Sequence, residues 1–251
     1  LTIRRPPRAP RFPYPTLWRS VWFRLILPQD SLPLALMLAL RAALLVGVLN
    51  ALWGTKLGVE PFLATLGTLF IGQSVQQLSS NGGQPIYLLS QTLPDGFSAI
   101  GHGALLGIPL PLWILLLVAL ALYQLLHRSA TGRALSVMGE QYSVALHSGI
   151  AVKRLTAWAF VLSALIAGLV GLILAANVKA WVPLSGNAYL LNAIGASFIG
   201  AAFAPSRRPN VIGTLLGVVF LSFIANGLLL IGWNFYWQQV ATGVFIFIVL
   251  A

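Results

Sequence analysis

Residues 155–177 read LTAWAFVLSALIAGLVGLILAAN, 23 consecutive positions without a charged side chain. An α-helix needs about 20 apolar residues to cross the roughly 30 Å hydrocarbon core of a bilayer, so this stretch predicts a transmembrane helix. The whole chain of 251 residues is 58% hydrophobic and only 8% charged. Such a composition lacks the polar surface that a soluble protein of this size exposes, which argues against a soluble enzyme or binding domain.

Other apolar stretches predict an all-α fold, a polytopic bundle of transmembrane helices. Breaks at Gly, Pro and charged residues separate the predicted spans 31–53, 61–78, 104–126, 155–177, 190–204, 211–230 and 237–251. The short run 190–204 contains Asn192 and is expected to be a crossing, or a tilted or broken helix that lines a cavity. We expect one transmembrane domain over residues 31–251, preceded by residues 1–30, which are expected to form a basic cytoplasmic N-terminal segment and the start of the first helix.

The basic residues between the spans predict the orientation of the chain in the membrane. The positive-inside rule places the connection 127–154 in the cytoplasm, because it carries Arg128, Arg133, Lys153 and Arg154. The expected outer connections are 79–103, 178–189 and 231–236, whose only basic residue is Lys179. Since the basic residues lie between apolar spans, the excess of 15 Lys and Arg over four Asp and Glu indicates orientation and not a nucleic-acid partner.

The N-terminal segment breaks this rule. An inward-running span 31–53 places Ser31 outside, although six arginines precede it. We therefore expect the sequence to join discontinuous segments, with an odd number of spans missing near Asp30 and Ser31; three more would give about ten in the complete chain. The alternative is that residues 17–27 form a buried or interfacial amphipathic helix and that the rule is violated.

The most specific motif lies in the connection 127–154, where residues 129–150 read SATGRALSVMGEQYSVALHSGI. This stretch resembles the cytoplasmic loop of bacterial ABC importer permeases of the ribose, xylose, arabinose and galactose type, a family with an autoinducer-2 branch. That loop commonly reads T-x-x-G-R-x-x-x-A-x-G-x-N-x-x-A-A-x-x-S-G-I. Residues 61–68, PFLATLGT, and residues 213–217, GTLLG, resemble further segments of the family. Its G-G-I-D-L-S-V-G segment is absent here, which agrees with missing spans.

The resemblance implies a transport function. The chain would be the permease subunit of an ATP-driven importer in the bacterial inner membrane, and it would move a sugar or sugar-like solute from a periplasmic solute-binding protein into the cytoplasm. The implied partners are a second permease copy or paralogue, cytoplasmic ATPase subunits that bind ATP and Mg, the binding protein and membrane lipid. No cofactor is expected in the chain itself, because it has no G-x-x-x-x-G-K-[ST] phosphate loop.

The same loop is expected to couple the permease to the ATPase. A helix over Ala134–His147, turned by glycine hinges at Gly132 and Gly149, would seat in a groove on that partner. The residues expected to take part in coupling are Gly132, Arg133, Met138, Gly139, Glu140, Ala145, Ser148 and Gly149. The alternative is an ordinary cytoplasmic connector.

Polar or aromatic residues inside the spans are candidates for the solute pathway. An unpaired polar group in hydrocarbon costs free energy, so such residues should face other helices or a water-filled path. The candidates are Phe62, Thr65, Asn192 and Asn226. Hydrogen bonding between helices is the alternative role. Arg41 lies inside the first span, where placing its charge in lipid costs free energy. No function is assigned to it, and the alternative is that its long side chain extends to the membrane interface.

Neither a catalytic residue nor a metal site is predicted. The chain has four acidic residues, three scattered histidines and no cysteine, from which no nucleophilic triad or metal-ligand set can be assembled. The alternative function is a secondary transporter or channel for a small polar solute. Such proteins place ionisable groups near the middle of the membrane, and Arg41 is the one candidate here.

Overall fold

The computed structural model describes residues 32–80, 82–87, 95–140, 142–203, 209–232 and 234–250. The chain divides into two compact units, a first unit of residues 1–112 and 151–184 and a second unit of residues 113–150 and 185–251. The basic segment 1–30 and the junction of Asp30 with Ser31 lie outside the described residues, so the expectations about them stay predictions.

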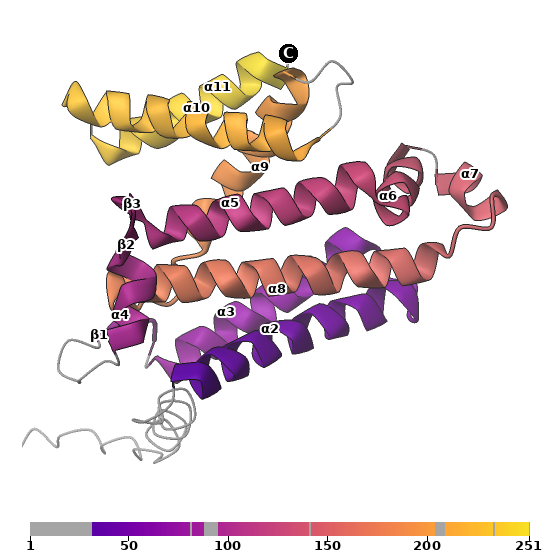
Figure 1. The fold of residues 1–251 in the computed structure, drawn as a ribbon, viewed down its shortest axis with the longest axis horizontal. Helices are drawn as coiled ribbons and strands as arrows, with labels where there is room; N and C mark the ends of the chain where they lie inside the picture. Colours follow the sequence, from indigo (N-terminus) through magenta and orange to yellow (C-terminus); the bar gives the residue numbers. More distant parts are fainter. Residues whose placement is uncertain are drawn as a thin grey trace, which may run out of the picture. The chain divides into compact units, whose positions relative to one another are not determined.

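Helices account for most of the described chain (Figure 1). The α-helices are α2 (Leu32–Thr55), α3 (Pro61–Ser79), α4 (Asp95–His102), α5 (Leu110–Tyr123), α6 (Ala130–Glu140), α7 (Tyr142–His147), α8 (Val152–Val178), α9 (Asn187–Phe203), α10 (Val211–Leu230) and α11 (Phe235–Leu250). A π-helical segment, η1 (Gln124–Arg128), continues α5. The strands are β1 (Ile86–Tyr87), β2 (Ala104–Leu105), β3 (Ile108–Pro109) and β4 (Ala180–Trp181). The predicted all-α fold is confirmed.

Four helical stretches of the described chain are long and apolar enough to cross a membrane: Leu36–Thr55, Leu110–Arg128, Val152–Val178 and Val211–Leu230. The other predicted spans coincide with α3, α9 and α11, which are shorter or more polar. At about 1.5 Å rise per residue, α9 is about 25 Å long, less than the roughly 30 Å of hydrocarbon. The number of crossings therefore stays a prediction, as does a tilt of α9, which is one unbroken helix.

The predicted span 104–126 is wrong at its start. β2 pairs antiparallel with β3 to form a hairpin, and α5 begins only at Leu110. Leu106 and Gly107, at the tip, have φ values of 56° and 79°. Positive φ at both central positions is what a two-residue type I′ turn requires. Hydropathy did not reveal the hairpin because its residues are as apolar as the helix that follows. α4, within the predicted outer connection 79–103, was also not predicted.

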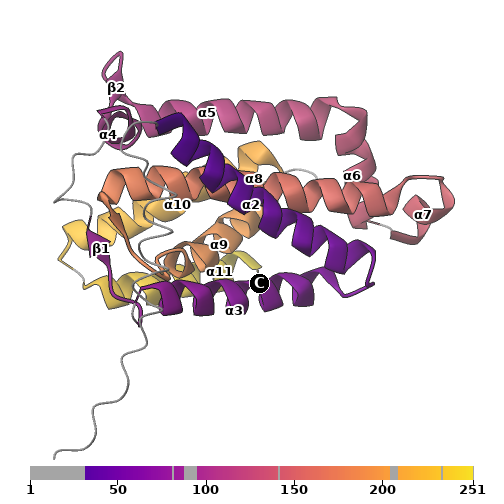
Figure 2. The same ribbon diagram turned by 90° about the horizontal axis from the view of Figure 1, so that it is seen from below.

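The first unit is built on the antiparallel pair α2 and α8, seen from two sides in Figures 1 and 2. A Cβ added to Gly47 would come within 2.7 Å of the Ala164 methyl carbon, and a Cβ on Gly168 within 2.6 Å of the Ala43 methyl carbon. The glycines therefore let the two backbones approach closely. Small residues serve this purpose between membrane helices, where lipid supplies no hydrophobic drive for association.

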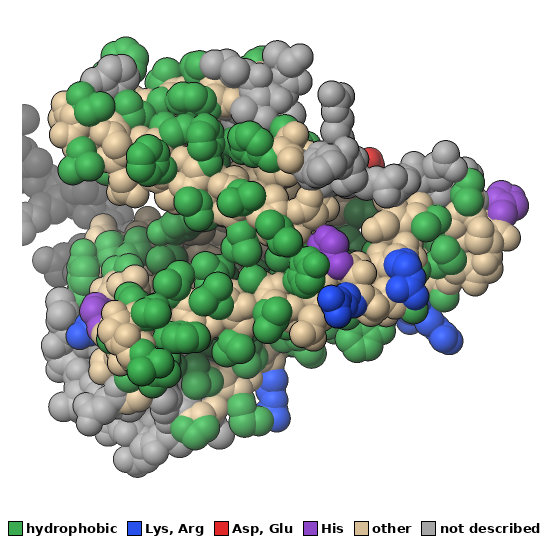
Figure 3. Space-filling view, turned by 45° about the horizontal axis from the view of Figure 1, so that its top comes forward, with side chains coloured by type: hydrophobic (Ala, Val, Ile, Leu, Met, Phe, Trp, Pro, Cys, Tyr) green, Lys and Arg blue, Asp and Glu red, His purple; other side chains and the backbone are tan. Residues whose placement is uncertain are grey.

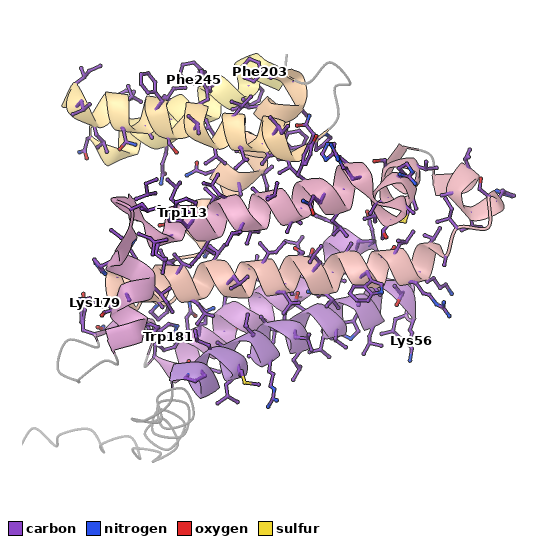
Figure 4. All side chains as sticks on the ribbon, viewed as in Figure 1. Lys56, Trp113, Lys179, Trp181, Phe203 and Phe245 are labelled. Atoms are coloured by element: carbon purple, nitrogen blue, oxygen red, sulfur yellow. The ribbon has the colours of Figure 1, made fainter. Side chains whose placement is uncertain are left out.

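The two ends of the first unit differ in the basic and aromatic residues that lie there. Lys56 follows the C-terminal end of α2, whereas Lys179 and Trp181 lie at the opposite end, beyond α8 (Figure 4). Because α2 and α8 are antiparallel, Lys153 and Arg154 at the start of α8 lie at the Lys56 end. Basic residues thus gather at the end that is predicted to be cytoplasmic, and the orientation itself stays a prediction.

Two connections are tied together at the other end of the first unit. β1 pairs antiparallel with β4, with Tyr87 opposite Ala180. On α3, the Gln76 Oε1 atom accepts a hydrogen bond of 3.0 Å from the backbone N–H of Leu184, which has a φ of 62°. The segment 82–87 is therefore paired with the segment 180–184 through β1 and β4, and the second segment is also hydrogen-bonded to α3.

The core of the second unit lies between α9 and α10, which are antiparallel. A Cβ on Gly200 would overlap the backbone of Gly213, and a Cβ on Gly217 would overlap the carbonyl of Ala196. Ile199, which is completely buried, completes this contact. As between α2 and α8, the absence of side chains allows close backbone approach.

Aromatic rings connect α11 to this core. Phe220 of α10 makes edge-to-face contacts with Phe203 of α9 and Phe245 of α11, with centroid distances of 6.2 and 6.1 Å. Phe203 and Phe245 are labelled in Figure 4. Such pairs stabilise packing beyond the apolar area that they bury.

Hydrophobic side chains are spread widely over the face shown in Figure 3, and charged side chains are few among its described residues. Leu230, Leu106 and Phe247 are 89%, 86% and 81% exposed. A soluble monomer rarely exposes extended apolar surface, whereas helices whose solvent is lipid must do so. The surface therefore agrees with a membrane protein.

Candidate functional site

The predicted coupling segment, residues 129–150, contains two described helices, on either side of residue 141, which is not described. α6 begins at Ala130 and ends at Glu140, and α7 runs from Tyr142 to His147 in contact with α6. The predicted helix Ala134–His147 is therefore wrong in its start, and its continuity across residue 141, which lies outside the described residues, stays a prediction.

Ser129 explains why α6 begins early. Its backbone is extended, with φ −92° and ψ 159°, and its Oγ atom accepts a hydrogen bond of 3.0 Å from the backbone N–H of Gly132. This is the geometry of a helix N-cap, which satisfies an amide that has no partner within the helix. The same hydroxyl donates to the carbonyl of Leu125 in η1. Ser129 thus joins α6 to the end of the preceding helix.

Gly132 has a different role from the hinge that the sequence suggested. It is buried within α6 and does not have a positive φ, so it does not use the backbone freedom for which a glycine hinge was expected there. A Cβ at this position would overlap the carbonyl oxygens of Leu126 and Leu125. Only glycine allows α6 to fold back so closely against η1.

Gly149 does form the turn that was predicted. Its φ is 71°, and the N–H of Ile150 donates to the carbonyl of Ala145 at 3.3 Å. A left-handed residue followed by this hydrogen bond is the Schellman motif, which closes the C-terminal end of α7. The S-G-I end of the loop motif is therefore a helix cap.

The predicted coupling residues separate into buried and exposed groups. Ala145 is fully buried, with 0% exposure, so like Gly132 it stabilises the segment and offers no surface to a partner. Met138 is half-buried, and Glu140 ends α6 with its side chain outside the described part of the structure. The exposed members are Arg133, Gly139, Ser148 and Gly149.

Sequence reasoning missed three exposed aliphatic side chains on this segment. Val137 of α6 and Val144 and Leu146 of α7 are 38%, 45% and 55% exposed. Apolar side chains on a connection predicted to lie in water were the signal that could have identified them. Arg133, one turn before Val137, is also exposed, and we name these four exposed residues of the segment, Arg133, Val137, Val144 and Leu146, the coupling surface.

Two of the predicted pathway residues lie at the start of α3 in the first unit. Phe62 is 66% exposed. The half-buried Thr65 hydroxyl lies within hydrogen-bond distance of two carbonyl oxygens of its own helix, Phe62 O at 2.9 Å and Pro61 O at 3.1 Å. The structure therefore brings Phe62 and Thr65 together, one turn apart.

The other two pathway residues lie in the second unit and do not meet. The side-chain amides of Asn192 and Asn226 donate to carbonyls of their own helices, Ala188 O at 3.4 Å and Ser222 O at 2.8 Å. Because Ala196 faces Gly217 in the antiparallel pair α9 and α10, Asn192 is level with about position 221. Asn226 is therefore more than a helical turn further along.

A polar pair between α2 and α3 was not predicted. Thr68 Oγ1 donates to the Oδ1 atom of Asn50, 2.9 Å away, and Asn50 is only 9% exposed. Thr68 belongs to the PFLATLGT motif, and Asn50 is a polar residue within a span, so both carried a signal. Hydrogen bonds of this kind hold membrane helices in register.

Chemistry-bearing side chains are sparse in the described part of the chain. Within it, no three His, Asp or Glu side chains lie close enough to hold a metal ion. His127, on η1, stacks on the ring of Tyr123 at a centroid distance of 4.7 Å. The features that remain are the coupling surface and the polar residues of the helices.

The family of the chain follows from comparison with known proteins. The family model described as "Branched-chain amino acid transport system / permease component" matches residues 18–250. The chain belongs to this permease family. The resemblance noted in the 129–150 loop is confirmed, and with the apolar helices the family shows a multi-pass inner-membrane protein.

Several curated members of the permease family are similar to the chain. The ribose import permeases of Bacillus subtilis (strain 168) and Escherichia coli (strain K12) are 34% and 32% identical over 199 and 209 residues. These alignments cover 79% and 83% of the chain, and 61% and 64% of the relatives. The autoinducer 2 import system permease of Photorhabdus temperata is 28% identical over 82% of the chain and 63% of its own length. The chain therefore spans less than two thirds of these relatives. No solved structure matches it.

Proposed function

We propose that the chain is the membrane-spanning subunit of an ATP-driven importer for a sugar or sugar-like solute. Its support is membership of the permease family and similarity to proteins that import ribose and autoinducer 2. The observation that carries the proposal is the coupling surface, a cation and three exposed aliphatic side chains on a capped two-helix segment at a predicted cytoplasmic connection.

The partners of this subunit follow from the same proposal. A second permease copy or paralogue completes the path, and a periplasmic binding protein delivers the solute. Cytoplasmic ATPase subunits bind ATP and Mg and hydrolyse the nucleotide. The permease has no catalytic site of its own, and its task is to convert the motion of the ATPases into opening and closing of the path.

The local structure suits the coupling segment to transmit that motion. Because α5 continues into η1, and Gly132 packs α6 directly on the η1 carbonyls, a displacement of α6 passes to the long helix formed by α5 and η1. The Ser129 cap and the Gly149 turn fix both ends of the segment. An element held in this way moves as a body instead of deforming.

The solute path is proposed to include Phe62 and Thr65. Both lie on the first turns of α3, where Phe62 is largely exposed. The Thr65 hydroxyl donates to its own helix, so its oxygen lone pairs can still accept a hydrogen bond from a sugar hydroxyl. Asn192 and Asn226 are proposed to contribute amide groups to the path in the second unit.

The test compares two leucines at opposite predicted sides of the membrane. Leu146→Arg, on the coupling surface, should weaken co-purification with the ATPase about tenfold or more, because a charge then replaces a buried apolar contact. Leu106→Arg, at the tip of the hairpin, is the matched control and should leave ATPase binding unchanged. Ribose uptake and solute-stimulated ATP hydrolysis are measured in reconstituted vesicles.

Two results would contradict the proposal. Equal ATPase binding by the Leu146→Arg and Leu106→Arg variants would remove the coupling surface as the docking site. Uptake that continues without the ATPase, and that stops when the ion gradient is dissipated, would instead show a secondary transporter.

A further inference from the structure

One exposed face of α2 carries a single charge among aliphatic side chains. Arg41 lies within the candidate membrane span Leu36–Thr55 and is exposed. The exposed side chains around it on this face are Met37, Leu44, Leu45 and Val48. We name these five residues the Arg41 face.

The Arg41 face points away from the helices that pack on α2. Ala43 and Gly47 contact α8, and Asn50 is hydrogen-bonded to α3. Since an α-helix turns about 100° per residue, Arg41 and Asn50 lie on opposite sides of α2. Neither α8 nor α3 covers the guanidinium.

Among the described residues, Arg41 also lacks a counter-charge. No hydrogen bond or ion pair of Arg41 is found among the described side chains, and α2 contains no acidic residue. A guanidinium at membrane depth needs a pairing group, because hydrocarbon does not solvate it.

The depth and direction of the side chain indicate where that group lies. α2 has 24 residues. It is therefore about 36 Å long, and centring it on roughly 30 Å of hydrocarbon places the Arg41 Cα about 10 Å below the boundary nearer to its N-terminal end. Helical Cβ atoms tilt toward the N-terminus, so the side chain extends toward that same boundary. Local thinning of the bilayer brings lipid phosphates closer to it.

We propose that the Arg41 face binds an anionic phospholipid, with its phosphate paired to Arg41. Guanidinium and phosphate form paired, charge-assisted hydrogen bonds. Leu44 and Leu45 lie about one turn deeper than Arg41, near the middle of the membrane, along the direction that the acyl chains of that lipid take. A lipid fits this face better than a protein helix, because its aliphatic side chains are large and are not the small residues that let membrane helices approach closely. The site does not rest on the transport function.

The experiment measures lipid binding to the full chain. Purified, delipidated protein in detergent is titrated with dioleoylphosphatidylglycerol, and bound lipid is counted by native mass spectrometry. Arg41→Ala should bind the lipid about tenfold more weakly than wild type, the effect expected for loss of a charge-assisted hydrogen bond. Arg41→Lys should retain part of the affinity. Lys56→Ala, which removes an exposed charge just beyond the other end of α2, should bind as wild type does.

Several outcomes would overturn the proposal. Wild-type lipid binding by Arg41→Ala would do so, as would an equal loss in Lys56→Ala, which would indicate general attraction to basic residues. Loss of a bound protein partner from Arg41→Ala, with lipid retained, would assign the face to a protein contact. If Arg41→Ala fails to fold, Arg41→Leu keeps the face apolar and repeats the test, with circular dichroism as the folding control.

Discussion

Replacing Gly132 by alanine should loosen the coupling segment, although alanine is the better helix former. Gly132 lies in α6, and its built Cβ overlaps the carbonyl oxygens of Leu126 and Leu125. Both obstructing atoms are backbone, so no side chain can rotate out of the way. Gly139 lies in the same helix, with nothing within 4 Å of its built Cβ. The two positions therefore form a matched pair for one substitution.

The structure sets the size of the expected difference. In a helix, alanine is favoured over glycine by at most about 1 kcal/mol, and this gain is open to both variants. Overpacking typically costs about 1–3 kcal/mol, and only Gly132→Ala carries that cost. The free energy of opening α6 should therefore be lower in Gly132→Ala than in Gly139→Ala by about 1–3 kcal/mol.

Hydrogen–deuterium exchange of the α6 amides, followed by mass spectrometry, measures this difference. A loss of 1–3 kcal/mol corresponds to exchange that is roughly 5–150 times faster, since each 1.4 kcal/mol is about a factor of ten. Amides of α10 serve as the internal reference. Equal protection of α6 in the two variants would refute the close packing of α6 on η1.

Three further sets of substitutions test other contacts. Gly217→Ala should lower the stability of α9 and α10 by about 1–3 kcal/mol, since its Cβ would overlap Ala196, whereas Gly227→Ala in the same helix meets nothing and should be neutral or stabilising in thermal unfolding. In a double-mutant cycle, Asn50→Leu and Thr68→Val should show a coupling energy of about 0.6 kcal/mol, and a value of zero would show that their hydrogen bond does not form. Ser129→Ala should cost about 1 kcal/mol of α6 stability in the exchange assay, and Ser129→Asp should restore it.

Hydropathy predicted the long helices well because a helix that crosses lipid must consist of about 20 mostly apolar residues. The predicted span 211–230 coincides with α10, and 155–177 lies within α8. The same measure failed at residues 104–109, where the apolar hairpin resembles the start of a helix. It also missed α4, a helix of eight residues in a predicted connection.

The loop motif identified the family, but it did not reveal the structural role of each of its residues. Gly132 was expected to be a hinge because glycine permits unusual backbone angles, yet it is needed because a neighbouring backbone leaves no room for a side chain. Gly149, chosen for the same reason, does have a positive φ. Spacing along the chain cannot separate these two uses of glycine, because one depends on φ and the other on distant atoms.

By itself, the sequence determined the solvent, the class of fold and the family, because a run such as residues 155–177 is stable as a helix in lipid whatever its neighbours are. Only the tertiary structure decided which polar groups are paired and which side chains form a surface. Asn50 finds its partner on another helix, Ala145 is enclosed, and Leu146 beside it is exposed. Exposure and pairing depend on atoms brought together by packing, and no local pattern in the sequence encodes their distances.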